Sequence, residues 1–311
     1  MPATAISPRC ISEDSKYNKI SVKCRFCSSE SLVKRGWRAT RNRGKQQRWL
    51  CNDCNKSSTL DLGFWKMKNS ENLVTQSIDQ YFQNLSSRVV QRNLNQYNET
   101  KASHQSVLNW VRKYAKKLST FVNTLNPKFS GEFCVDETII KCKKKEGIFW
   151  AGIDGQTKYI ANSFYTLNPQ NIKDAKRLLS GLKATKQTKF IQTDSRGQYP
   201  PAFKNIFKYD KRKKNNSVEH KVINTHKTGK YNVKIERFFR NLKERTRLMY
   251  GFKSYSSATL ILEGYRIWYN FIRPHMSLRT TPAIASGLEL GLGHNKLWGL
   301  IVLSSINKFS R

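Results

Sequence analysis

The sequence predicts an α/β fold for the second half of the chain, preceded by two small N-terminal modules. From Phe133 onward, three strand-like runs follow one another: FCVDETII, GIFWAGID and YIANSFYT. A helical stretch, a fourth strand (TKFIQTD) and further helices come next. This order is that of a ribonuclease-H-like fold, in which a helix leads from three hairpin-connected strands to a fourth. We expect this domain to span residues 130–290.

The N-terminal part contains two Cys-x-x-Cys pairs, formed by Cys24, Cys27, Cys51 and Cys54. Four thiolates in this pattern bind a tetrahedral Zn²⁺ and leave no open position for chemistry, so this zinc would be structural. The alternatives are four unrelated cysteines or a redox pair. We predict a loose leader over residues 1–20 and a zinc ribbon over residues 21–62, with a hairpin and a basic turn between the pairs.

Residues 70–125 have the pattern of three helices, and we predict a helix-turn-helix DNA-binding domain there. Ser86-Ser87 and Ser103 are the expected N-caps of the second and third helices. In a helix-turn-helix, the last helix enters the major groove with its N-terminal residues on base edges. The residues expected to touch bases are His104, Gln105, Ser106 and Asn109. The alternative is a plain three-helix bundle.

The composition restricts the partners of the chain. Lys and Arg number 57 against 21 Asp and Glu, so the formal net charge is +36. Aromatic residues make up 12%, which excludes a disordered basic tail. Positive charge spread along the whole chain favours an extended nucleic-acid contact surface, with an anionic membrane surface as the other candidate. The charge and the adjacent zinc module together favour double-stranded DNA as the partner. No apolar run approaches the roughly 20 residues that span a bilayer, and no secretory signal is seen, so we expect a cytoplasmic protein without a membrane partner.

Three acidic residues are expected to meet at the sheet. Asp136 lies within the first strand, Asp194 ends the fourth, and these two strands would be neighbours. Glu236 lies on a helix predicted over residues 231–251 and can lean over the same point. Carboxylate oxygens favour Mg²⁺ or Mn²⁺. Two such ions about 4 Å apart clamp the attacking and leaving oxygens of a phosphoryl transfer.

Both strand acids have alternative interpretations. In the alternative for Asp136, this residue only forms hydrogen bonds at the end of a strand, and Glu137 or Asp154 is the metal ligand instead. Asp194 is, in its alternative, only the cap of the tight turn that follows it.

The predicted helix over residues 231–251 also carries a row of cations. Arg240, Lys243 and Arg247 follow Glu236 at i+4, i+7 and i+11, so all four share one side of the helix. In the metal-site interpretation, Lys243 and Arg240 hold the scissile phosphate, and Arg247 extends the DNA contact. In the alternative, Glu236 forms an internal salt bridge on a solvated face.

The sequence resembles insertion-sequence transposases of the DDE class, in particular the cointegrate-forming prokaryotic group. The resemblance rests on FCVDET, QTDSRGQY, NVKIERFFRNLKERTR and the tail WYNFIRPHMSL followed by TPAIASGL. It covers nearly the whole chain, since some members also have a zinc-binding segment and a helix-turn-helix ahead of the catalytic domain. It implies catalytic roles for Asp136, Asp194, Glu236 and Lys243.

The resemblance implies an enzyme that cuts at the ends of its own mobile element and joins them to target DNA. Such an enzyme works as a homo-oligomer, here in a prokaryotic cytoplasm at the nucleoid. One departure is the long interval of residues 195–235 between the second and third acids, which includes a basic loop at 208–216. The alternatives are a DNA-binding protein without chemistry and a nuclease that cuts without joining. Residues 291–311 are expected to form a C-terminal tail.

Overall fold

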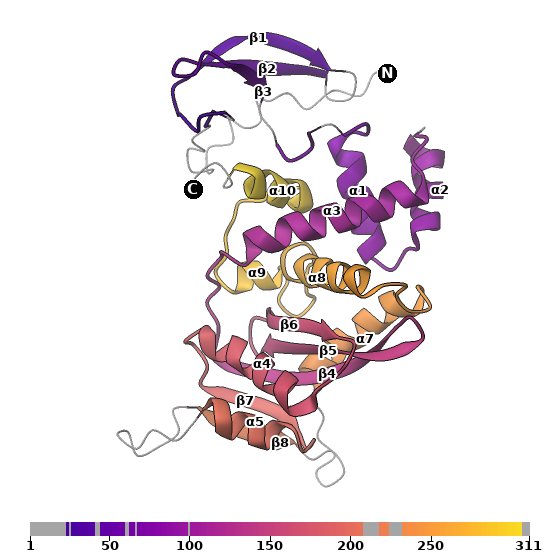
Figure 1. Ribbon diagram of the computed structural model, residues 1–311, viewed down its shortest axis with the longest axis vertical. Coiled ribbons are helices and arrows are strands. Elements are labelled where there is room, and N and C mark those ends of the chain that lie inside the picture. Colours follow the sequence, from indigo (N-terminus) through magenta and orange to yellow (C-terminus); the bar gives the residue numbers. More distant parts are fainter. Residues whose placement is uncertain are drawn as a thin grey trace.

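The computed structural model describes residues 23–306, except for residues 25, 41–43, 60–61, 66, 99, 208–217 and 224–231. The expected leader at 1–20 and the basic loop at 208–216 therefore lie outside the described residues. Figure 1 shows the parts arranged along the long axis, with a small β-ribbon at one end, a group of helices next to it and a larger sheet beyond.

The ribbon is an antiparallel sheet of β1 (Leu32–Thr40), β2 (Gly44–Cys51) and β3 (Ser57–Thr59). The hairpin predicted between the two Cys pairs is formed by β1 and β2, and its basic turn at 41–43 lies outside the described residues. β1 is exposed along nearly its whole length, so the ribbon has little hydrophobic core of its own. A module this small needs a cross-link such as a bound metal ion to fold stably.

Three helices follow: α1 (Glu71–Phe82), α2 (Ser87–Asn98) and α3 (His104–Val122). The hydroxyl of Ser86 accepts the backbone N–H of Val89 at 3.2 Å, and that of Ser103 accepts the N–H of Ser106 at 3.2 Å. These are the side-chain N-caps that the sequence predicts, and each satisfies one amide that has no partner inside its helix.

The residues expected to form a C-terminal tail contain a buried helix, α10 (Lys296–Ile306). It packs on α1 and α3 and buries Leu300 and Ile301 completely. The indole N–H of Trp298 donates to Glu71 at 2.5 Å and ties α10 to the start of α1. The run LWGLIVL is apolar all round, as expected of a helix inside a core, and for that reason it shows no amphipathic period.

The larger sheet has five strands in the order β6-β5-β4-β7-β8. The strands are β4 (Glu132–Cys142), β5 (Lys145–Asp154), β6 (Ile160–Thr166), β7 (Phe190–Asp194) and β8 (Glu219–Ile223). β4, β5 and β6 are antiparallel neighbours, whereas β7 pairs parallel with both β4 and β8. This mixed sheet confirms the ribonuclease-H-like fold class, and β8 lies at one edge of it.

Helices cover both faces of this sheet. The helices α4 (Asn171–Ala184) and α5 (Tyr199–Ile206) pack on one face, where Phe133 and Val135 of β4 join their core. The other face is covered by α7 (Val233–Arg247) and α8 (Tyr255–Phe271), and Cys134 and Ile140 of β4 belong to that second core. Successive side chains of β4 thus point to opposite cores, as strand geometry requires.

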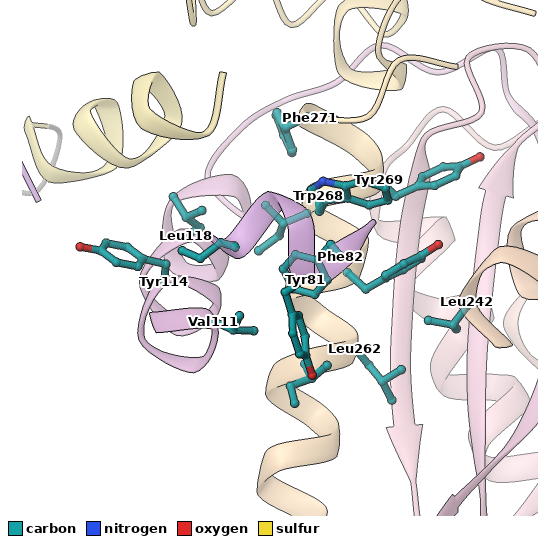
Figure 2. Close-up of a cluster of buried hydrophobic side chains, with 14 of the residues drawn as sticks. Tyr81, Phe82, Val111, Tyr114, Leu118, Leu242, Leu262, Trp268, Tyr269 and Phe271 are labelled. Carbon is teal, nitrogen blue, oxygen red and sulfur yellow. The ribbon is translucent and has the colours of Figure 1, made fainter. Parts of the chain in front are cut away.

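α8 joins the sheet to the N-terminal helices. It lies between α3 and the sheet (Figure 1), and its buried side chains meet those of α1 and α3 (Figure 2). A Cβ on Gly264 would stand 2.8 Å from the ring of Phe82, so only glycine allows this approach of α8 to α1. A short helix, α9 (Pro282–Ala285), packs beside α8. Within the described residues, none of the helices is both long and apolar enough for a membrane span.

Candidate active site and metal centre

Asp136 lies near the middle of β4, on the face that α7 and α8 cover. It shares this face with Cys134 and Thr138, while Glu137 points to the opposite face. Its Oδ1 accepts the backbone N–H of Glu137 at 2.8 Å, which is the one hydrogen bond of this carboxylate within the described residues. The carboxylate oxygens of Asp136 therefore keep most of their lone pairs available to bind a metal ion.

Asp194 is the last residue of β7, next to β4. The parallel register ends at the pair of Cys134 and Gln192, and Asp136 and Asp194 each lie two residues further on, at the same end of adjacent strands. Burial, together with the negative charges of Glu137 and Asp194, raises the pKa of Asp136 to about 7. A nearby cation stabilises the ionised form of two acids that lie close together. Carboxylate oxygens are ligands that Mg²⁺ and Mn²⁺ prefer.

Glu236 lies in the first turn of α7, but its side chain is bent back toward the start of its own helix. Its Oε1 accepts the backbone N–H of Asn232 at 3.0 Å. Among the described residues, only the four cysteines form a group of three or more possible metal ligands whose atoms all lie within 4.8 Å of one another. The structure thus brings Asp136 and Asp194 together and turns Glu236 toward Asn232.

Asn232 connects α7 to both of the strands that carry the aspartates. It is buried, its Nδ2 donates to the carbonyl of Val135 in β4 at 3.2 Å, and its Oδ1 accepts from Gln192 in β7 at 3.0 Å. Sequence reasoning gave this residue no role. The available signal was its spacing, since Asn232 precedes Glu236 by one helical turn.

The two alternative ligands are both saturated by hydrogen bonds. Asp154 is fully buried and accepts bonds from the backbone and hydroxyl groups of Ser130 and Thr157, which fixes the turn between β5 and β6. Glu137 accepts bonds from three side chains of the segment after Asp194. Asp136, with one bond, is the better candidate for a metal ligand.

Arg240, Lys243 and Arg247 of α7 are exposed and stand apart from Glu236. Within the described residues no ion pair joins Glu236 to Arg240, Lys243 or Arg247, so the internal salt bridge is not formed. Lys243 follows Glu236 by seven residues, or about 10 Å along the helix axis. These side chains therefore stay a prediction as phosphate ligands, and the structure shows them exposed to solvent.

A second group of cations surrounds the start of α7 and comes from three separate segments. Burial and the positive charge of Lys234 lower the pKa of Lys158, in the turn between β5 and β6. Burial and the positive charges of Arg273, Lys158 and Arg237 likewise lower the pKa of His275. Mutual repulsion of this kind is relieved by an anion such as a phosphate. Sequence reasoning missed this group because its members are far apart in the chain.

The four cysteines at the base of the ribbon are arranged as two matching turns. The Sγ atoms of Cys24 and Cys54 are 3.6 Å apart, and those of Cys27 and Cys51 are 3.5 Å apart. A disulfide needs about 2.05 Å, whereas thiolates about 2.3 Å from a tetrahedral Zn²⁺ lie about 3.8 Å from one another. The geometry therefore fits a zinc ion and does not fit a disulfide.

The residues expected to read bases lie at the N-terminal end of α3. Gln105 and Asn109 are exposed one turn apart, and the amide of Gln105 donates to that of Asn109 at 3.1 Å. His104 and Ser106 are partly buried, and the backbone N–H of His104 donates to Gln91 of α2 at 3.1 Å.

Comparison with known proteins gives one family match. The family model described as "DDE domain" matches residues 130–275. No curated protein matches this chain.

Comparison with solved structures gives weak similarities. The catalytic core domain of HTLV-2 integrase, in complex with magnesium and in a trimeric form, has 13% identity and a TM-score of 0.36 over 51% of this chain and 97% of that chain. The simian T-cell lymphotropic virus intasome, in complex with PP2A regulatory subunit B56 gamma, has 11% identity and a TM-score of 0.37 over 66% of this chain and 72% of that chain.

Proposed function

We propose that this chain is a DDE transposase, as the match of residues 130–275 to the DDE-domain model supports, and that it catalyses DNA cleavage and strand transfer of an insertion sequence by two-metal-ion phosphoryl transfer. The observation that carries this proposal is the position of Asp136 and Asp194 at the same end of adjacent parallel strands, where burial and the charges of Glu137 and Asp194 raise the pKa of Asp136 and only one hydrogen bond within the described residues reaches its carboxylate. This is the environment in which a divalent cation is held by carboxylates.

The residues that would hold the ions are Asp136, Asp194 and Glu236. When bound, two divalent ions would activate the attacking oxygen and stabilise the leaving oxygen of an in-line displacement. To take part, Glu236 would leave the N–H of Asn232 and turn toward β4. Lys243 and Arg240 would bind the phosphate next to the scissile bond.

The N-terminal modules would bind the ends of the element. The helix-turn-helix of residues 70–125 would read bases through His104, Gln105, Ser106 and Asn109, and Arg240 and Arg247 would contact the backbone. The zinc ribbon of residues 21–62 would hold one structural Zn²⁺ on its four cysteines, a role that the spacing of the Sγ atoms supports. We further propose a homo-oligomer that pairs two element ends with a target duplex in a prokaryotic cytoplasm, at the nucleoid.

The test is a strand-transfer assay with labelled duplexes carrying the element's own ends, a supercoiled target and Mg²⁺ or Mn²⁺. Glu236→Gln is expected to reduce joined products by about 100–1,000-fold while DNA binding is kept, because a group that stabilises transition-state charge is worth this much. Glu244→Gln is the matched control, since Glu244 lies on the same helix, is exposed and bonds only to Asn84 among the described side chains.

The products separate the competing functions. Joined strands from the wild type and from Glu244→Gln, with none from Glu236→Gln, would support the transposase. Nicks without joining would indicate a nuclease on the same fold. Binding of the ends with neither cutting nor joining would leave a DNA-binding protein, and the assignment of the three acids would be withdrawn.

A further inference from the structure

A buried carboxylate lies directly behind Asp136. Glu137 is the next residue of β4 and points through the opposite face of the sheet, toward α5. Its side chain is only 2% exposed. A carboxylate in such a place is tolerated only where hydrogen-bond donors replace its lost hydration.

Three donors do so, and all three come from the segment that follows Asp194. Arg196 donates through Nη1 and Gln198 through Nε2, at 2.8 Å, to one oxygen of Glu137, and the hydroxyl of Tyr199 donates to the other. Tyr199 is fully buried. Three donors around one carboxylate match its ionised form, which only accepts hydrogen bonds.

Arg196 also contacts the second acid of the candidate metal site. Its Nε lies 3.2 Å from Oδ2 of Asp194, and its backbone N–H donates to Oδ1 of Asp194 at 3.1 Å. One guanidinium therefore bridges a buried carboxylate behind β4 and an accessible carboxylate at the end of β7. The side chain of Arg196 is 56% exposed while that of Glu137 is buried, so Glu137 is the fixed end of this bridge.

We propose that Glu137 is a positioning residue whose charge holds Arg196, so that Arg196 neutralises Asp194 in the metal-free protein and releases it when a divalent ion binds. This inference rests on the proposed function, because it takes Asp136 and Asp194 as ligands. A guanidinium has five N–H donors in a fixed fork, so Arg196 can keep its bond to Glu137 when it gives up Asp194.

The charge of Glu137 lowers the energetic cost of that release. With Glu137 ionised, Arg196 leaves Asp194 without becoming an unpaired cation. If Glu137 were neutral, Asp194 would be the only carboxylate within ion-pair distance of Arg196 among the described residues, and an incoming ion would have to break that ion pair. Removing the charge of Glu137 should therefore weaken metal binding, and removing Arg196 as well should restore it.

The experiment measures the Kd for Mn²⁺ by calorimetry on the full-length protein in four forms: wild type, Glu137→Gln, Arg196→Gln and the double variant. Asp136→Asn identifies which heat belongs to the candidate site. Glu137→Gln is expected to bind Mn²⁺ about tenfold more weakly, in line with the loss of one charged hydrogen bond. Arg196→Gln and the double variant are expected to bind at least as tightly as the wild type.

Recovery in the double variant separates this role from simple support of the fold. A loss of affinity that persists in the double variant would mean that Glu137 only supports β4, and it would overturn the proposal, as would equal Kd values for the wild type and Glu137→Gln. If Glu137→Gln does not fold, Arg196→Gln still decides, since weaker Mn²⁺ binding than the wild type is incompatible with a competing guanidinium. A wild type that binds Mn²⁺ no better than Asp136→Asn would instead count against the proposed function.

Discussion

The two candidate metal sites differ in how far the protein assembles them before any ion arrives. The four cysteine sulfurs all lie within 4.8 Å of one another. Of the three acids, Asp136 and Asp194 are neighbours, whereas Glu236 is bonded to the start of its own helix. The difference follows from distance along the chain, because each Cys pair closes over a single turn while the acids come from two strands and a later helix. The four thiols are thus gathered before any metal binds, whereas one of the three carboxylates still points away from the other two.

The cysteine site should give the largest effect when its metal is removed. Structural zinc contributes about 10–16 kcal/mol to small zinc-binding modules, and the hydrophobic clusters of the described residues contain none from β1, β2 or β3. A chelator should therefore unfold residues 32–59 and leave β4–β8 folded, as measured by hydrogen exchange. Cys51→Ser should give the same pattern, with no further change on chelation. Loss of protection throughout the large sheet would contradict the independence of the two regions.

The acid site should respond to pH in the absence of Mg²⁺ or Mn²⁺. The pKa of Asp136 is about 7 in the folded protein against an ordinary 3.8. The folded state thus holds this proton more tightly than the unfolded state does. Ionisation of Asp136 therefore lowers the free energy of unfolding progressively as the pH rises from about 4 to about 7. Asp136→Asn removes this cost and should be more stable than the wild type by roughly 2–3 kcal/mol at pH 8, after allowance for partial exposure.

Urea unfolding of the two proteins across this range measures the effect. The two unfolding free energies should agree near pH 4 and diverge above it, and added Mg²⁺ should narrow the gap by neutralising the wild-type carboxylate. Curves that stay parallel from pH 4 to pH 8 would show that Asp136 is not held under charge repulsion. In that case the acid site would resemble the cysteine site, as a group already compensated by the protein.

The same distinction between local and dispersed features separates what the sequence reveals from what it hides. The caps at Ser86 and Ser103 were predictable because each interaction spans three residues. The cysteine site was predictable because each Cys-x-x-Cys pair is a local motif, although the sulfur contacts between the pairs join residues 30 and 24 positions apart. The adjacency of Asp136 and Asp194 followed from strand order alone. The bonds from Asn232 to Val135 and from Tyr199 to Glu137 were not predictable, since they join residues 97 and 62 positions apart and depend on side-chain direction.

A substitution of Asn232 changes how firmly the start of α7, which carries Glu236, is held against β4 and β7. Asn232→Ala removes the bonds that fix the start of α7 to the carbonyl of Val135 and the amide of Gln192, at an expected cost of about 1–3 kcal/mol in the free energy of unfolding. Strand transfer should fall by about 10–100-fold, as for other residues that orient a metal ligand, with binding of the element ends kept. Asn241→Ala on the same helix is the control, and an equal loss of activity there would make the effect one of helix stability.

The smallest effects are expected from the exposed cations beside the acid site, and they test whether α7 faces DNA. Each phosphate contact releases counterions, so Arg240→Gln should reduce the slope of log K against log salt by about 1 and weaken binding of specific and unrelated duplexes alike. Lys173→Gln is the matched control, because Lys173 is equally exposed but lies on α4, behind the opposite face of the sheet. A salt titration of both variants decides the matter. Equal slopes would mean that Arg240 contributes only net charge, and the DNA path would then have to run over other cations, such as Lys158, Lys234 and Arg237 around the start of α7.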